Sequence, residues 1–426
     1  MSATLIMQHA TITTQCCIAG GGPAGMMLGL LLARAGVDVV VLEKHGDFLR
    51  DFRGDTVHPS TLELMYELGM LERFLARPHD AVRELSAVVG GESLVIADFS
   101  RLPTVCKFVA MMPQWEFLDF LRDEAARYPG FRLILNAQAQ GLTQDAAGRV
   151  TGVQADSDQG PVRIACSLAV AADGRHSTLR SVAGLPVQDI GAPIDVLWMR
   201  IPREPGDPSA TGGRIDAGRF LALINRSSYW QCAFVIPKGG HDALRARGIA
   251  AFRQDVVAAA PMFAGRIDTA IPGWDDVKLL SVSVDRLRTW WRPGLLCIGD
   301  AAHAMSPIGG VGINLAIQDA VAAANVLAAP LARRAPPQVV DALLPRVQAR
   351  RLLPTRVTQA VQVAVQNRLL SPVLGARRPL QVPWVLRLAQ RWRWLRTLPA
   401  RAVGIGVRAE HVRSPSAAPP TAGGMA

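Results

Sequence analysis

The most constraining feature of this chain is a glycine-rich turn between two apolar runs near its N-terminus. Gly20, Gly22 and Gly25 have the G-x-G-x-x-G spacing of a dinucleotide-binding turn, with Cys16–Ala19 before it and residues 26–35 after it. The first glycine permits the bend, the second admits a pyrophosphate close to the backbone, and the third lets the helix pack on the strand. The start of that helix then offers unpaired N–H groups to the phosphates.

The segment after the turn completes a strand–turn–helix–strand unit. Gly36 stands where a helix C-terminal glycine belongs, and residues 37–42 form a β-branched run typical of a buried strand. Glu43 follows that strand, 18 positions after the last glycine of the turn, close to the spacing of an acid that binds a ribose hydroxyl. An exposed charge at a strand end is the alternative for Glu43, but the complete unit favours a nucleotide site.

Length and composition indicate a large globular protein with several structural units. The chain has 426 residues, of which 50% are hydrophobic and 19% charged, so two or three units are expected. Its six cysteines have no CxxC or metal-ligand spacing, which favours a reduced, cytoplasmic protein without disulfides or a metal site.

The net charge of +11 is concentrated near the C-terminus. From residue 331 onward, sixteen arginines stand against Asp341 and Glu410, which argues against a general nucleic-acid-binding surface. Residues 1–13 lack the features of a signal peptide, and no uninterrupted apolar run is long enough to span a bilayer. We therefore expect neither a leader nor a spanning segment in this sequence.

Two later motifs each place an aspartate at the end of a buried strand. Asp173-Gly174 follows the apolar run 168–172, and Gly299-Asp300 follows the run 294–298. The second aspartate precedes a glycine-rich loop and a helix expected from near residue 313 to residue 327. Two helix N-termini can serve two parts of one ligand, a pyrophosphate and a ring that gains negative charge on reduction.

Together these motifs resemble those of FAD-dependent aromatic-ring monooxygenases related to para-hydroxybenzoate hydroxylase, over roughly residues 13–330. The resemblance implies an α/β fold: a Rossmann-like FAD-binding domain, an inserted antiparallel-sheet substrate domain and a C-terminal helical segment. Val311 is a departure, because many members carry a polar residue between the two glycines there.

The resemblance also implies roles for individual residues. Glu43 would bind the adenosine ribose of FAD, Asp173 would lie near the pyrophosphate, and Asp300 would hold the ribityl or pyrophosphate portion. The turn 309–314 would face the isoalloxazine ring, with Pro307 bordering the oxygen site. No catalytic residue is assigned, and the cofactor-binding residues implied are Gly20, Gly22, Pro23, Ala24, Gly25, Glu43, Lys44, Arg53, Gln114, Asp173, Gly174, Asp300, Pro307, Gly310, Gly312, Ile313 and Asn314.

The resemblance and the local patterns divide the chain into seven parts. Three parts of the FAD-binding domain alternate with two parts of the substrate domain, and a basic segment and a tail expected to be disordered follow. The parts are 1–80 (FAD-binding), 81–112 (substrate-domain strands), 113–185 (FAD-binding), 186–285 (substrate domain), 286–345 (FAD-binding), 346–413 (basic helical segment) and 414–426 (tail).

The implied chemistry is an NAD(P)H- and O2-dependent hydroxylation. NADH or NADPH would reduce FAD, oxygen would give a flavin C4a-hydroperoxide, and a hydroxyl group would pass to a small hydrophobic aromatic, quinone-like or polyketide substrate. Two alternatives stay open, a flavin-dependent reductase or dehydrogenase on the same fold and a non-catalytic binding protein with that fold. A halogenase is disfavoured, because the substrate domain lacks the W-x-W-x-I-P motif.

Several other residues have simpler interpretations. His58 and His303 fit structural hydrogen-bonding roles better than roles as catalytic bases. The basic segment interleaves arginines with Trp384, Trp392 and Trp394. It fits either a helical cap packed over the FAD-binding domain or a peripheral contact with a membrane surface.

Overall fold

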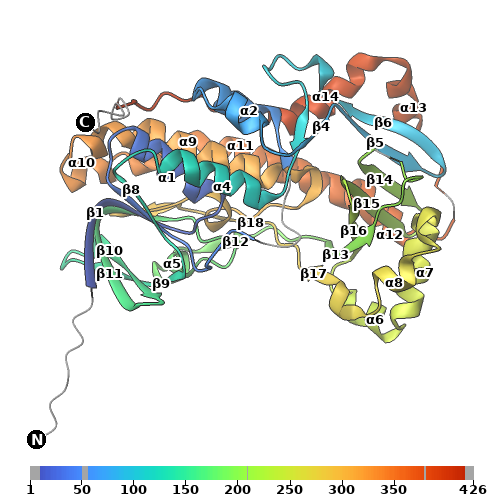
Figure 1. Ribbon diagram of the computed structural model, residues 1–426, viewed down its shortest axis with the longest axis horizontal. Helices are drawn as coiled ribbons and strands as arrows, with labels where there is room; N and C mark the ends of the chain where they lie inside the picture. Colours follow the sequence, from blue (N-terminus) through green and yellow to red (C-terminus); the bar gives the residue numbers. More distant parts are fainter. Residues whose placement is uncertain (1–9, 50–55, 209, 379, 418–426) are drawn as a thin grey trace, which may run out of the picture.

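A computed structural model describes residues 10–49, 56–208, 210–378 and 380–417 (Figure 1). Its first layer is an eight-stranded sheet in which β1, β2, β8, β11 and β20 run parallel, while β19 and the hairpin β9–β10 are antiparallel additions. The strands are β1 (Ala10–Ala19), β2 (Val39–Leu42), β8 (Phe131–Ile134), β9 (Ala137–Gln144), β10 (Val150–Ser157), β11 (Gly160–Ala171), β19 (Trp291–Arg292) and β20 (Leu295–Cys297).

The register of the parallel strands aligns their carboxyl ends. Ala19 of β1 is opposite Leu42 of β2 and Ala171 of β11, and Ala171 is opposite Cys297 of β20. These strands are buried on both faces, which explains their continuous apolar runs. The residues that follow the four strands therefore emerge along one edge of the sheet.

Helices cover this sheet on the face where the larger hydrophobic core lies (Figure 1). α1 packs against α4 and α9, and α9 also packs against α11. With the preceding short turn, α9 is long and apolar enough to cross a membrane, but most of it is buried inside the fold. The helices of this region are α1 (Pro23–Arg34), α2 (Pro59–Glu67), α3 (Leu71–Leu75), α4 (Gln114–Ala125), α5 (Thr178–Val182), α9 (Val311–Ala332), α10 (Pro337–Asp341) and α11 (Leu344–Val365).

The second layer is a seven-stranded sheet in the order β17-β13-β16-β15-β14-β5-β6, antiparallel except where β14 meets β5. Three helices, α6 (His241–Ala246), α7 (Ile249–Ala259) and α8 (Ile267–Ala270), cover one face over a separate core. The strands are β5 (Glu84–Val89), β6 (Glu92–Asp98), β13 (Ile194–Pro202), β14 (Gly212–Asp216), β15 (Arg219–Arg226), β16 (Tyr229–Pro237) and β17 (Lys278–Leu280).

Two small sheets connect the layers. β3 (Thr56–Val57), β7 (Val109–Met111) and β4 (Asp80–Val82) form one, and β12 (Val187–Asp189) with β18 (Asp285–Leu287) forms the other. The fold confirms the expected architecture of a parallel-sheet core, an additional antiparallel sheet and C-terminal helices. One detail differs, because β7 pairs with β3 and β4 and not with the strands of residues 84–98.

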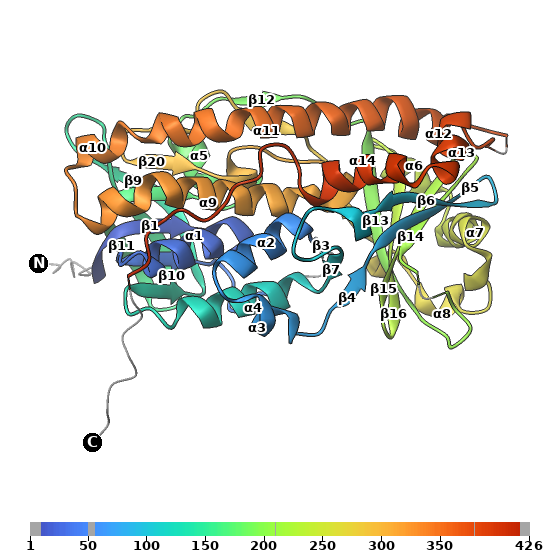
Figure 2. The ribbon, with the colours of Figure 1, turned by 90° about the horizontal axis from the view of Figure 1, so that it is seen from above.

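The C-terminal region returns across the whole molecule. After α12 (Ser371–Gly375), α13 (Trp384–Arg391) and α14 (Arg393–Gly404), an extended segment runs back past α2 and α9 to α1 (Figure 2). We call residues 405–417 the C-terminal strap. Residues 414–417 were expected to be disordered, but Ser414 is buried and the Ala417 N–H donates to the carbonyl of Arg34 at 2.8 Å. Residues 418–426 lie outside the described part.

Two helices are longer than their sequence pattern indicates. α9 begins at Val311 and ends at Ala332, beyond the expected limits at both ends, because its last turns still bury Leu327, Ala328 and Leu331. α11 is one helix of 22 residues that begins two residues before the expected basic helical segment. Its buried residues are largely polar, so an apolar period could not reveal it.

Candidate functional site

The glycine turn after β1 is held by close backbone contacts. Gly20 has φ +106°, and a Cβ there would lie 2.3 Å from the carbonyl oxygen of Ala172. A Cβ on Gly25 would lie 1.9 Å from the carbonyl oxygen of Gly20. Both positions therefore exclude any side chain, as the spacing predicts for the bend and for helix–strand packing.

The second glycine of the motif, Gly22, faces open space. A Cβ on Gly22 would have no protein atom within 4 Å. Gly22 is also the N-cap of α1, no side chain caps this helix, and its first turn contains no acidic residue. Pro23, Ala24 and Gly25 thus begin a helix whose N-terminal donors are available to a phosphate group.

Glu43 lies at the end of β2 beside this turn. Its carboxylate accepts hydrogen bonds from the N–H of Gly21 at 3.0 Å and from the N–H of His45 at 3.1 Å, and the side chain is buried. The carboxylate is therefore fixed next to the glycine turn, where it could accept ribose hydroxyls with its remaining lone pairs. Lys44 is exposed. Arg53 lies outside the described residues.

The middle and late motifs meet at the same sheet edge. Asp173 accepts a hydrogen bond from the N–H of Leu179 at 3.2 Å through Oδ2, while its buried Oδ1 has no partner within the described structure. The guanidinium of Arg175, next to Gly174, lies 3.8 Å from Asp300. Arg180 is buried and donates to the carbonyl of Ala301 at 3.2 Å. These contacts join two motifs that are far apart in the sequence.

The loop before α9 presents a second open helix terminus. Gly309 and Gly310 have φ +77° and +62°, which reverses the chain after Pro307. No side chain caps α9 and its first turn has no acidic residue, so the N–H groups near Gly312 and Ile313 face outward from the helix end. A helix end of this kind favours negative charge by about 0.3–2 kcal/mol.

Asn314 fixes this turn to the small sheet. Its Oδ1 accepts hydrogen bonds from the N–H of His58 at 3.0 Å and from the Thr61 hydroxyl at 2.7 Å. The Thr56 hydroxyl donates to the carbonyl of Gly310 at 3.1 Å. Gln114, at the start of α4, follows β7 by three residues, and β7 pairs with the strand that contains Thr56.

Three glutamines, two in α11 and one directly after it, support the same loop and were missed in the sequence. Gln359 donates to the carbonyls of Asp285 and Ala304, at 2.7 and 3.0 Å. Gln362 and Gln366 bind Ser306, next to Pro307, through its backbone and its hydroxyl. Their spacing of three and four residues places them on one helix face and was the available signal.

A buried charge network lies behind the late motif. Asp319 of α9 accepts hydrogen bonds from the N–H of Gly299 at 3.0 Å, from His303 Nε2 at 2.6 Å and from Arg351 Nε at 2.8 Å. Burial alone would raise the pKa of Asp319, but His303 and Arg351 outweigh it and hold that pKa below its usual value. Glu410 of the strap lies 3.8 Å from Arg351 and bonds Arg350 at 2.6 Å.

His58 is also a structural residue. Its Nδ1 donates to the carbonyl of Val403 in α14 at 2.8 Å, and burial lowers the pKa of His58 to about 4. A histidine with so low a pKa is a weak base, and the Nδ1 of His58 is already bonded. His58 is therefore unsuited to act as a catalytic base. His303 is likewise committed to Asp319. The structural interpretation therefore fits both histidines better than a catalytic one.

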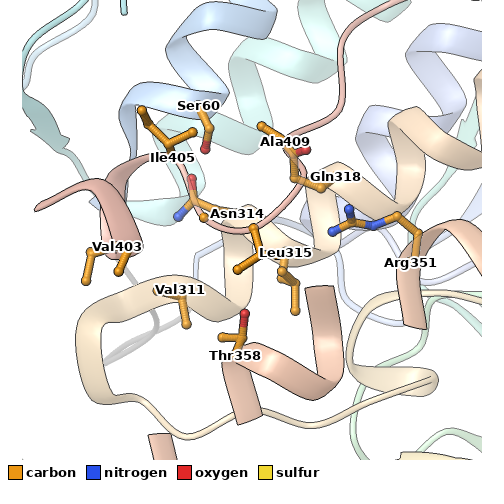
Figure 3. A pocket seen from close by; sticks show the side chains of 13 residues that line it. Ser60, Val311, Asn314, Leu315, Gln318, Arg351, Thr358, Val403, Ile405 and Ala409 are labelled. Carbon is orange, nitrogen blue, oxygen red and sulfur yellow. The ribbon is translucent and has the colours of Figure 1, made fainter. Parts of the chain in front are cut away.

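A small cavity lies between α9, α11 and the start of the strap (Figure 3). Its volume is about 30 Å³, and Asn314, Gln318, Arg351 and Val403 are among the side chains that line it. This volume is too small for an aromatic ring system. Because of its size, the cavity is no site for flavin or substrate. It lies behind the open end of α9.

Comparison with known proteins identifies the class. A family model described as an FAD binding domain matches residues 13–360. The chain belongs to this family. It is 35% identical over 372 residues to 6-methylpretetramide 4-monooxygenase of Streptomyces rimosus, covering 86% of this chain and 87% of that protein. It is also 29% identical to dialkyldecalin synthase of Streptomyces rugosporus, covering 76% of this chain and 67% of that protein.

The solved structures agree on the fold. PqsL of Pseudomonas aeruginosa, described as a probable FAD-dependent monooxygenase, matches with a TM-score of 0.71 at 21% identity. The match covers 85% of this chain and 98% of that protein. The chain is therefore an FAD-dependent monooxygenase of the aromatic and polyketide hydroxylase class, as the three motifs indicated.

The geometry of this chain fits the cofactor. The open space at Gly22, the uncapped start of α1 and the fixed carboxylate of Glu43 suit the phosphate and ribose groups of FAD. The unpartnered Oδ1 of Asp173 supplies a further buried acceptor at the same edge. The second open helix end, at α9, suits the electron-accepting ring.

Proposed function

We propose that this protein is an NAD(P)H- and O2-dependent monooxygenase that hydroxylates an aromatic, polyketide-like substrate. The observation that carries the proposal is the convergence of three separate motifs on one edge of a parallel sheet, together with two uncapped helix N-termini. The 35% identity to a protein named for 4-monooxygenation of 6-methylpretetramide supports the reaction type and the substrate class.

We assign the adenosine half of FAD to the turn that follows β1. Gly20–Gly25 would receive the pyrophosphate, Glu43 the ribose hydroxyls, and Asp173 would accept a hydrogen bond from the cofactor near the pyrophosphate. Asp300, held by Arg175, would bind the ribityl or pyrophosphate portion. Lys44, Arg53 and Gln114 stay proposed contacts of FAD. Within the described structure neither Lys44 nor Gln114 bonds the turn, and Arg53 lies outside the described residues.

We assign the ring of FAD to the turn before α9. Bound FAD supplies hydride acceptance from NADH or NADPH and oxygen activation. The N–H groups of Gly312 and Ile313, beyond the turn that Gly310 forms, would stabilise negative charge on the reduced ring through the helix end. Asn314 and Gln362 hold this turn in place, so these donors need no rearrangement when charge develops.

The substrate would approach from the side of the antiparallel sheet. Ile308, directly after Pro307, packs with residues of β13, β15 and β16, so the turn and that sheet share an apolar boundary. An apolar boundary suits a hydrophobic aromatic substrate and keeps water from the reacting centre. We place the reaction in the cytoplasm, where the nicotinamide cofactors are available.

One experiment tests the reaction type. The purified protein would be mixed with NADH or NADPH under 18O2 and a panel of phenols, naphthols and aromatic polyketides, and product and peroxide would be measured. We expect a yellow protein and one 18O atom in a hydroxylated product. Peroxide without product for every compound would favour the reductase-like alternative.

Two further outcomes would also contradict the proposal. A colourless protein that cannot be reconstituted with FAD would indicate a binding protein. An isomerised product that forms without cofactor oxidation would favour a non-redox reaction, and the identity to a dialkyldecalin synthase makes this the second candidate.

A further inference from the structure

The helices α13 and α14 carry an unusual set of exposed apolar side chains. Trp384, Trp392, Trp394 and Leu398 are 74%, 47%, 57% and 57% exposed. The six tryptophans earlier in the chain are buried or half-buried. Exposed tryptophan is costly in water, so three of them within residues 384–398 require an explanation other than the core.

The exposed side chains have helical spacing. Trp394, Leu398 and Arg401 stand at i, i+4 and i+7 of α14, and Trp384 and Arg391 stand at i and i+7 of α13. The opposite side of α14 is packed, because Ala400 and Val403 contact Phe99, Met111 and neighbouring core residues. The outer stripe is thus a surface that the fold does not use. We call Trp384, Arg391, Trp392, Trp394, Leu398 and Arg401 the tryptophan–arginine face.

The segment that carries this face has positive charges only. Residues 342–409 contain no aspartate or glutamate. Of the nearby acids of β6, the half-exposed Glu92 pairs with Arg387 and the buried Asp98 lies 3.4 Å from Arg393, so each has an arginine as its counter-charge. In the described structure, Arg377, Arg378, Arg391 and Arg401 are exposed and make no ion pair.

We propose that the tryptophan–arginine face docks on an anionic lipid bilayer. Tryptophan prefers the boundary between headgroups and acyl chains, and arginine is attracted to anionic headgroups. α14 carries both residue types on its outer side and packs its apolar inner side on the protein. This arrangement favours a helix that lies in the plane of the interface. Within the described part of the chain, the helix that is long and apolar enough to span a membrane is α9 with its preceding turn, and it is mostly buried, so the contact that we propose is peripheral.

The location of the face gives the contact a consequence for the flavin site. The inner side of α14 holds His58 through Val403, and Val403 lies 3.6 Å from the position of a Cβ on Gly309. The docked helix would therefore lie directly outside the turn before α9. A hydrophobic substrate dissolved in the bilayer would be delivered close to that turn.

Vesicle co-sedimentation of the full-length protein tests the proposal. Vesicles of phosphatidylcholine with 40% phosphatidylglycerol would be compared with vesicles of phosphatidylcholine alone, at 0.1 and 0.5 M NaCl. We expect binding to the anionic vesicles that falls with salt, and a blue shift of tryptophan fluorescence on binding. The measurement needs no turnover, so it is independent of the proposed reaction.

Matched variants locate the contact. Arg391→Gln with Arg401→Gln should weaken partitioning about 25-fold, since each arginine contributes roughly a factor of five near an anionic surface. Trp392→Gln with Trp394→Gln should remove the blue shift and most of the binding. Arg247→Gln with Tyr66→Gln changes an exposed arginine and an exposed aromatic residue elsewhere, and should bind like the wild type.

Three results would overturn the proposal. The wild type could fail to bind either vesicle, or the variants of the face could bind as well as the wild type. Light scattering could instead show a dimer that the tryptophan variants convert to a monomer, which would make the face an interface between copies of this chain. Unchanged flavin absorbance and thermal melting in every variant would show that folding is intact.

Discussion

At the residue scale, Asp319 joins three segments of the chain through one buried carboxylate. It fixes the backbone of the late motif at Gly299, orients His303, and neutralises Arg351 on the neighbouring helix. All three side chains are nearly inaccessible to water. Removing one member of such a set leaves an uncompensated charge in the core, which costs far more than an exposed ion pair contributes.

We expect Asp319→Asn to lower the free energy of unfolding by about 3–5 kcal/mol, because Arg351 would remain buried without its closest counter-charge. FAD affinity should fall as well, since Gly299 loses its anchor. Urea unfolding and flavin titration measure the two effects. Asp38→Asn, which breaks an exposed pair with Arg334, is the control and should cost less than about 1 kcal/mol. Equal effects of the two substitutions would contradict this assignment.

His58 makes stability depend on pH. Burial lowers its pKa to about 4, against about 6.5 in the unfolded chain, so the unfolded state binds the extra proton first. The contribution of His58 to the free energy of unfolding is fully present above pH 6.5. It declines by up to about 3 kcal/mol as the pH falls toward 4. Urea unfolding between pH 7 and 4 should show this slope.

His58→Asn supplies the comparison, since asparagine can still donate to Val403 but does not titrate. Its stability should be lower at pH 7 and should decline less steeply with acid than that of the wild type. Parallel slopes for the two proteins would show that His58 is not the group responsible.

At the element scale, the turn after β1 and the start of α1 separate folding from cofactor binding. Gly20 and Gly25 are required by backbone contacts within the protein, whereas Gly22 faces only open space. A methyl group on Gly22 would therefore disturb a bound phosphate and little else. Gly25 offers the opposite case, because its methyl group would collide with the backbone before any ligand binds.

Gly22→Ala should leave thermal stability nearly unchanged and weaken FAD binding by at least about tenfold, or 1.4 kcal/mol. Gly25→Ala should impair both folding and FAD binding. Gly265→Ala, where a Cβ also meets nothing, controls for the general effect of the substitution. Flavin fluorescence titration and differential scanning fluorimetry provide the measurements. Normal FAD affinity in Gly22→Ala would place the pyrophosphate elsewhere.

The elements also show which parts of the site the sequence could reveal. The turn at Gly20–Gly25 and the strand-end aspartates are predictable, because local spacing and strand periodicity determine them. Gln359, Gln362 and Gln366 were not predicted, because their partners at residues 285, 304 and 306 lie more than fifty residues away in the chain. The extent of α11 was missed for a different reason. Its buried face is polar, and a hydrophobic period detects only apolar faces.

At the scale of the whole molecule, the C-terminal strap holds the helical layer together. Its backbone bonds Asn325 of α9 and Glu67 of α2, and Glu410 bonds Arg350 of α11. Residue 417 reaches the end of α1. The strap lies beyond the matched family region, yet it contacts α1, α2, α9 and α11. It therefore forms part of the cofactor domain in this protein.

Deletion of residues 405–426 should lower the melting temperature and weaken FAD binding, whereas deletion of 418–426 should change neither. The longer deletion removes Glu410, which leaves the partly exposed Arg350 without its partner and Arg351 with Asp319 alone, at a cost of about 1–3 kcal/mol. It also exposes the surface of α9 that borders the cavity at Gln318. Glu410→Gln in the full-length chain separates these effects, because it removes the charge and keeps the strap's backbone contacts. If the ion pairs are the main contribution, Glu410→Gln should reproduce most of the loss; if covering α9 matters more, it should retain near-normal melting.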